Sequence, residues 1–273
     1  MKYKIFGIMI ALIFIPILAF IAVFIANNAV FFDFYDGGFN YYNINDTTMA
    51  MCKDHPSVEK TFYINSQVKR LNNLQSLELY ADPYYSLKFL KDFKSLEKLE
   101  LDAFSSYDAS TLDTLPALPD LKYIRLVCYE KDDLDCSPLG QLTSLEELAT
   151  FNVNIQDWSF TDNLPHLRRI HIFHDYYRND SFLKKSSLFD WTGLASAAGL
   201  EEFEAFNVIY DRAMLDALES IQSLNTVTIR FNFYEKDESE YPYIHDWIER
   251  MTEKGVSCKI YDFNDDKDGS SAD

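Results

Sequence analysis

The 273-residue sequence lacks the short motifs that mark common catalytic and cofactor sites. It contains no H-E-x-x-H, no G-x-S-x-G, no glycine-rich phosphate loop and no C-x-x-C pair. Among its five histidines, His171 and His174 are the closest pair, and residues three apart on a strand do not share a face. We therefore predict that the protein is not an enzyme and holds no metal or cofactor.

Basic residues are also scarce. The chain has 25 Lys and Arg against 43 Asp and Glu, a formal net charge of −18, and no basic cluster. A phosphate backbone requires a basic face, so this balance excludes a nucleic-acid partner. The acidic excess chiefly indicates solubility and gives a weaker indication of a cationic partner.

Cysteine occurs only four times. Cys128 and Cys136 flank one loop and are near enough in sequence to pair in an oxidising compartment, with free buried thiols as the alternative. The acidic stretch 264–269 matches the opening of a calcium loop, but the chain stops before the glutamate that would complete it. We interpret residues 262–273 as an acidic tail.

What the sequence does contain is a repeated phrase, in which an apolar residue is followed by others three and five positions later. The steps between successive copies are 22, 25, 24, 22, 33 and 24 residues. The copies are Leu74/Leu77/Leu79, Leu96/Leu99/Leu101, Leu121/Ile124/Leu126, Leu145/Leu148/Thr150, Leu167/Ile170/Ile172, Leu200/Phe203/Ala205 and Leu224/Val227/Ile229. Self-similarity at this period is typical of stacked repeats that share one core.

Each copy predicts a short half-buried strand, because its apolar residues alternate. The residues before it, such as Leu87, Leu90 and Phe93, have helical or turn spacing. One such unit cannot bury its apolar face alone, so neighbouring units must stack. We expect Leu99, Leu126, Leu148 and Ile170 to be successive rungs of one ladder.

Over about residues 56–231 the chain resembles the leucine-rich repeat family, and segments such as 134–148 resemble its short bacterial, internalin-like type. The resemblance implies an α/β solenoid with a concave parallel β-sheet and short helices or turns on the convex side. The family's asparagine after the strand is clear only at Asn152 and Asn207, so irregular turns are expected.

The N-terminal segment predicts a membrane anchor. Residues 5–26 are 22 uncharged, mostly apolar residues, which as a helix would measure about 33 Å, enough to cross a bilayer. Lys2 and Lys4 precede this run and Asp33 and Asp36 follow it, which places the repeats outside the cytoplasm. A cleaved signal peptide is the alternative, but the run is long for one.

We divide the chain into five parts. Residues 1–32 are the signal anchor, a single transmembrane helix, and residues 33–55 are a juxtamembrane linker. Residues 56–231 are the repeat array, of which 56–73 form an atypical N-terminal cap. Residues 232–261 are a C-terminal cap, with a helix over 241–255 and then a strand, and residues 262–273 are the tail.

A binding surface is predicted on the concave side, where the alternate strand positions point outward. There an aromatic row beside charged groups has the composition of a protein-binding surface. The candidate residues are Tyr80, Arg125, Phe151, Arg169, His171, Phe173, Glu204 and Phe206. One alternative is that the C-terminal flank covers this aromatic row. Another is that the ligand uses the insertion at 174–185, which is either a binding loop or a tolerated surface loop.

These features predict a non-catalytic, single-pass protein of the cell membrane whose extracytoplasmic repeat domain recognises a protein ligand on its concave face. The alternative is an immunity- or inhibitor-type or structural partner of another membrane protein, which the acidic charge would suit. An enzyme with its site in the 174–185 insertion is the least favoured reading, since no motif supports it.

Overall fold

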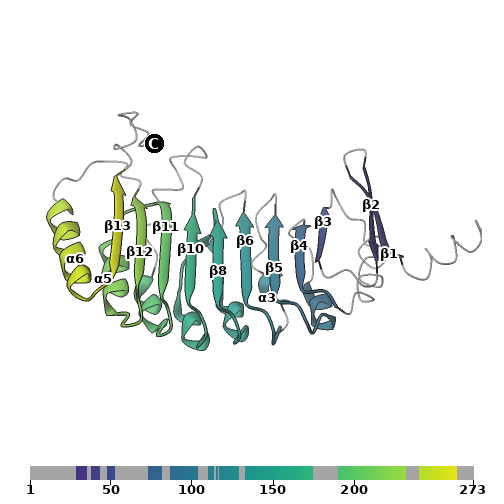
Figure 1. Ribbon diagram of the computed structural model, residues 1–273, viewed down its shortest axis with the longest axis horizontal. Coiled ribbons are helices and arrows are strands. Elements are labelled where there is room, and N and C mark those ends of the chain that lie inside the picture. Colours follow the sequence, from purple (N-terminus) through teal and green to yellow (C-terminus); the bar gives the residue numbers. More distant parts are fainter. Residues whose placement is uncertain are drawn as a thin grey trace, which may run out of the picture.

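The computed structural model describes residues 29–35, 38–43, 48–52, 73–81, 87–103, 110–113, 115, 117–128, 133–174, 190–231 and 240–262. Most of its strands form one nine-stranded parallel sheet, whose strands lie side by side in Figure 1. In order across the sheet these are β3 (Thr48–Cys52), β4 (Ser76–Ala81), β5 (Lys98–Ala103), β6 (Tyr123–Cys128), β8 (Glu147–Phe151), β10 (Arg169–Phe173), β11 (Glu202–Val208), β12 (Thr226–Phe231) and β13 (Ser257–Asp262).

The order of strands across the sheet is also their order along the chain. Each repeat adds one strand to the edge of the sheet, and a short helical segment connects that strand to the next. Every repeat therefore packs mainly on its two neighbours. A second, small parallel pair, β7 (Asp133–Leu134) with β9 (Asn154–Ile155), joins two of the returns. This arrangement is a leucine-rich repeat solenoid, as the repeated phrase indicated.

Short helical segments line up along the side of the solenoid that lies lowest in Figure 1. They are η1 (Leu87–Asp92), α3 (Ser110–Asp113), η2 (Ser137–Gln141), η3 (Ser159–Asn163), η6 (Trp191–Ser196) and α5 (Arg212–Ser220). An aspartate lies just before several of them: the backbone N–H of Ser137, Ser159 and Thr192 donates to the aspartate two residues earlier, at 2.8–3.0 Å. These bonds satisfy backbone donors that have no partner at a helix start.

The core lies between the sheet and these helical segments, and the second member of its ladder differs from the predicted one. Leu99 pairs with Ile124, Ile124 with Leu148, and Leu148 with Ile170. Leu126 belongs to the neighbouring ladder, between Leu101 and Thr150. The prediction was wrong by two residues, which keeps Leu126 on the buried face because strand side chains alternate with period two.

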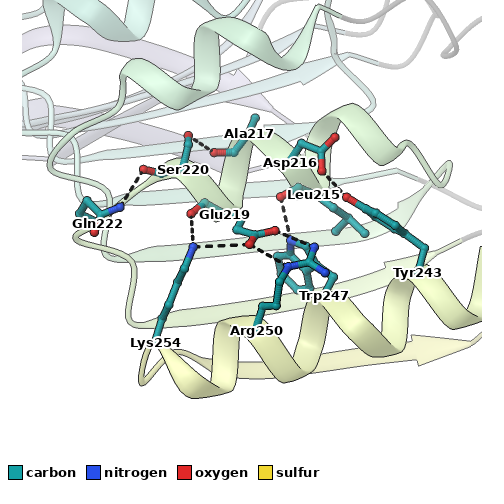
Figure 2. A network of polar contacts seen from close by, with 10 residues as sticks. All are labelled: Leu215, Asp216, Ala217, Glu219, Ser220, Gln222, Tyr243, Trp247, Arg250 and Lys254. Carbon is teal, nitrogen blue, oxygen red and sulfur yellow. Dashed lines mark hydrogen bonds and ion pairs between the residues drawn. The ribbon is translucent and has the colours of Figure 1, made fainter.

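The C-terminal end of the core is closed by α6 (Tyr241–Glu253), which packs on α5 (Figure 2). The indole Nε1–H of Trp247 donates to the Leu215 carbonyl at 2.8 Å, so this buried ring keeps its hydrogen bond. Arg250 binds both carboxylate oxygens of Glu219 at 2.8 Å, and Lys254 donates to the Glu219 carbonyl at 2.9 Å. This helix lies where the sequence indicated one, and Gly255, with φ of 84°, follows its end.

The segment that we had assigned to a linker, 33–55, contains regular structure instead. Residues 29–32, assigned to the anchor helix, and the residues after them form β1 (Ala29–Tyr35), which pairs antiparallel with β2 (Gly38–Asn43). Strand β3 then pairs parallel with β4, Met49 opposite Leu77. The solenoid sheet therefore begins before residue 56, because Thr48–Cys52 adds one more parallel strand at its edge, while aromatic and β-branched residues favour the hairpin.

The predicted membrane span, 5–26, lies outside the described residues, as do the segment 56–72 and the tail from 263. Within the part that the structure does describe, no helix has the length and apolar character needed to cross a membrane.

Candidate functional site

The outer face of the sheet, which points away from the helical segments, is the face predicted to be concave. Parallel in-register pairing aligns its side chains in three rows across the strands. These rows are formed by the first, third and fifth positions of the strands. The first-position residues are Lys98, Tyr123, Glu147, Arg169 and Glu202, and the third-position residues are Glu100, Arg125, Ala149, His171 and Glu204. The fifth-position residues are Val127, Phe151, Phe173, Phe206 and Arg230. Along β10, outward residues are half-buried and inward ones buried, as expected for one solvated face.

A depression interrupts this face at Ala149, whose methyl group stands between the longer side chains of Arg125 and His171 on the flanking strands. We call this hollow, of about 440 Å³, the Ala149 cup. Its lining comprises Tyr123, Arg125, Glu147, Ala149, Thr150, Phe151, His171 and Phe173. The volume lies within the ~300–1,000 Å³ typical of ligand pockets.

One wall of the cup is aromatic. Phe151, Phe173 and Phe206 are in register on successive strands, and the rings of Phe173 and Phe206 stack with centroids 5.1 Å apart and planes 1° from parallel. All three rings are half-buried, so the row is less exposed than predicted, and Phe173 and Phe206 cover one another by stacking. Within the described residues the C-terminal flank does not cover this row, since β13 extends the sheet sideways.

The opposite wall is polar and held by ion pairs between strands. Glu147 accepts from Arg169 Nε at 2.7 Å, and His171 Nδ1 lies 3.0 Å from Glu204 Oε2. His171 Nε2 is 3.7 Å from the second Glu147 oxygen, longer than an N–H···O hydrogen bond. The bonded Glu147 carboxylate raises the pKa of Arg169. These contacts fix the directions of side chains that would otherwise be mobile.

A second group of charges lies on the β5–β6 side of the cup. Glu100 binds Lys98 at 2.6 Å and Arg125 at 3.1 Å. Burial alone would raise the pKa of Glu100, but the bonds from Lys98 and Arg125 lower it in sum. Lys98 also lies 5.0 Å over the ring of Tyr123, whose pKa burial raises to about 12. Tyr123 therefore stays a neutral phenol at the rim of the cup.

The structure places most of the predicted site residues together. Arg125, Phe151, His171 and Phe173 line the cup, and Arg169, Glu204 and Phe206 contact or flank the residues that do. Tyr80 does not join them: its backbone is on β4, which β5 and β6 separate from β8, and its side chain lies outside the described residues. The same is true of 175–185, so the predicted insertion is described only at His174.

Tyr123, Glu147 and Ala149 also lie at alternate, outward strand positions, but the predicted site does not include them. The missed signal is a size contrast, a single alanine between an arginine and a histidine on adjacent strands. Tyr261 was missed as well, because β13 was read as a cap rather than as a further strand of the binding face. It is in register with Arg230 and is 44% exposed.

Neither a metal centre nor a disulfide emerges from the described residues. No group of three or more His, Cys, Asp or Glu side chains there is arranged to hold a metal ion. Cys136 is a free buried thiol whose pKa burial raises well above its ordinary value, and Cys128 is buried as well. Cys258 is partly buried, which raises the pKa of its thiol to about 11, so the thiolate is scarce at neutral pH.

Comparison with known proteins finds similar solved structures but no matching family. No family model and no curated protein matches the sequence. Internalin C2 of Listeria monocytogenes is 20% identical over 70% of this chain and 79% of its own, with a TM-score of 0.40. A chain of the Drosophila Toll–Spätzle complex is 12% identical over 62% of this chain and 25% of its own, also at 0.40. The assignment as a leucine-rich repeat solenoid therefore depends on this chain's own repeat and strand register.

Proposed function

We propose that the chain is a non-catalytic recognition protein that binds a protein partner on the outer face of its sheet. The observation that carries this proposal is the Ala149 cup, a hollow with an aromatic wall and an ion-paired polar wall on an ordered sheet face. Interface centres are enriched in aromatic residues and arginine, and energetic anchors insert into such pockets. Side chains held by neighbouring strands lose little further freedom on binding, which favours affinity.

We further propose that residues 5–26 anchor the protein in the cell membrane, with the solenoid on the extracytoplasmic side. This proposal is supported by the apolar length of the segment and by the lysines before it and the aspartates after it. An anchored solenoid presents its outer face to other surface proteins.

The test uses the full chain with a photocrosslinking phenylalanine analogue at one position. At Tyr261, exposed at the edge of the outer face, the analogue replaces one aromatic ring by another. The matched control position is Asn163, exposed at the end of η3 on the helical side. Irradiation of intact cells should yield a discrete crosslinked protein from position 261 and none from 163. Crosslinking from 163 alone would place the partner on the helical side and contradict the proposal.

A second measurement addresses energetics. Phe173→Ala removes the ring shared by the cup and the Phe206 stack. Truncation of an aromatic anchor costs about 2 kcal/mol or more, roughly thirtyfold in affinity. Because this ring is on the outer face and half-buried, we expect capture of the crosslinked partner to weaken by about that factor with little change in Tm. Unfolding of the variant would show instead that the ring belongs to the core.

A further inference from the structure

We propose that the Ala149 cup receives an arginine side chain from a basic segment of the partner; this inference rests on the proposed recognition function. The first step is the local charge. On the β8, β10 and β11 side of the cup, the first and third strand positions carry the carboxylates of Glu147, Glu202 and Glu204 against the single guanidinium of Arg169. A cation entering from this side meets a carboxylate excess, in a chain of net charge −18 that attracts cations from a distance.

The second step is a pair of acceptors. His171 Nδ1 lies at hydrogen-bond distance from Glu204 Oε2, and in the neutral tautomer that carries its proton on Nδ1 the Nε2 atom keeps a lone pair. Glu147 Oε1 is 3.7 Å from that nitrogen, and both side chains line the cup. A donor group placed between the two atoms reaches both at about 2.7–3.2 Å. A guanidinium, with five N–H donors and no acceptor, matches this pair.

The third step is the aromatic wall. Phe151 and Phe173 line the cup beside the acceptors, and guanidinium groups stack on such rings more readily than ammonium groups do. Arg125, on the far wall, has its charge directed to Glu100 at 3.1 Å, which reduces its repulsion of an incoming cation. Planar stacking, a carboxylate excess and two acceptors together select arginine over a neutral or acidic side chain.

The test titrates the full chain in detergent micelles with three capped amino acids: N-acetyl-arginine amide, N-acetyl-tyrosine amide and N-acetyl-glutamate amide. The readout is the imidazole NMR signal of His171, one of five histidines, assigned by its loss in His171→Gln. We expect saturable shifts with the arginine probe at millimolar concentration, at least tenfold weaker binding of the other two, and weaker arginine binding as ionic strength rises.

Two variants make the result specific. Glu147→Gln keeps the shape of the cup and removes one charged acceptor, so arginine affinity should fall about tenfold. Ala149→Phe fills the cup and should abolish the response, while the other histidine signals show that the fold is kept. The inference is overturned if the tyrosine or glutamate probe binds as well as arginine, if no probe binds, or if Ala149→Phe responds normally. Loss of partner crosslinking in Ala149→Phe without any arginine binding would retain the recognition function and reject only this occupant.

Discussion

At the scale of single residues, adjacent positions on strand β8 face opposite sides of the sheet and make different contacts. Leu148 is fully buried and touches the rungs formed by Ile124 and Ile170, whereas Glu147 points outward and binds Arg169. The strand period of two makes this contrast, and a register slip of one residue would exchange the two roles.

Replacement of Leu148 by alanine should therefore lower the free energy of unfolding by about 2–5 kcal/mol, the range for truncation of a buried leucine. The matched control is Glu147→Ala, which breaks partly exposed ion pairs and should cost less than about 1 kcal/mol. Denaturant unfolding followed by circular dichroism measures both. Equal losses at the two positions would contradict the register.

A glycine on the helical side is required by close packing. A Cβ at Gly193 would lie 2.4 Å from the Ser159 backbone nitrogen and 2.5 Å from the Trp158 carbonyl carbon, where η6 rests on η3. Trp158 and Trp191 stack beside this contact at 5.6 Å. Because backbone atoms cannot move aside as a flexible side chain can, a methyl group there must separate two repeats.

We expect Gly193→Ala to lower the free energy of unfolding by about 1–3 kcal/mol, the usual cost of overpacking. Gly140→Ala, in η2, is the control: the nearest atom to its Cβ is the Asn163 side-chain nitrogen at 3.3 Å. Thermal unfolding should show Gly140→Ala close to the parent protein. A Tm unchanged by Gly193→Ala would mean that the repeats are less closely packed than described.

At the scale of elements, the turns that leave the strands show how the repeats tolerate variation. Asn152 donates its backbone N–H to Phe173 O at 2.8 Å, and His174, in the same place one repeat later, donates to Phe206 O at 3.1 Å. Asn152 and Asn207 have φ of 57° and 59°, a conformation that asparagine tolerates. His174 thus stands where the neighbouring repeats have asparagine, and its ring is buried.

The histidine at this position makes the free energy of unfolding depend on pH. Burial lowers the pKa of His174 from 6.5 to about 4, so between these values the unfolded chain binds a proton that the folded chain does not. Neutral His174 therefore makes its full contribution to the free energy of unfolding above pH 6.5, and this contribution is lost as the pH falls towards 4. The loss is about 3 kcal/mol at most, because a shift of one pKa unit corresponds to about 1.36 kcal/mol.

His174→Asn, which places the neighbouring repeats' residue there, should remove this part of the pH dependence. The free energy of unfolding of the parent should fall more steeply between pH 7.5 and 5 than that of the variant, as measured by urea titration at each pH. Parallel profiles would show that His174 is accessible to protons in the folded state.

At the scale of the whole molecule, the acidic charge is not concentrated on the outer face. The fifteen outward positions named on β5, β6, β8, β10 and β11 and at Arg230 hold four acidic residues and four lysines or arginines. Arg125 pairs with Glu100 and Arg169 with Glu147 across strands, and Lys98 pairs with Glu100 within β5. The excess of 18 negative charges therefore acts mainly on approach and solubility, while the local pattern around the cup sets what fits there.

The proposed anchor predicts the location of the whole molecule. Protease added to intact cells should remove the solenoid, and the protein should remain in the membrane pellet after alkaline carbonate extraction, because residues 5–26 have the length to span a bilayer. Protease added after permeabilisation is the control for digestibility. A solenoid protected in intact cells, or a protein released by carbonate, would reject this topology.

The architecture follows from the repeat pattern of the amino-acid sequence. Seven apolar phrases at a period near 24 residues require stacked strand-and-turn units, and alternation within each phrase separates buried rungs from outward positions. The helix over Tyr241–Glu253 was also readable, since its apolar residues have helical spacing and a glycine ends it. Strand β3 was missed because its only signal, Met49 and Met51, is too short to distinguish from a linker.

The site, in contrast, depends on contacts between repeats that form only in the folded protein. The outward residues were readable one strand at a time, but the cup exists because Ala149 lies beside Arg125 and His171, which are 24 and 22 residues away in the chain. The choice of ion partners, Arg169 with Glu147 and His171 with Glu204, likewise depends on cross-strand distance. Periodicity specifies which face a side chain occupies, whereas the shape and charge of a hollow depend on its neighbours from other repeats, and only folding brings those together.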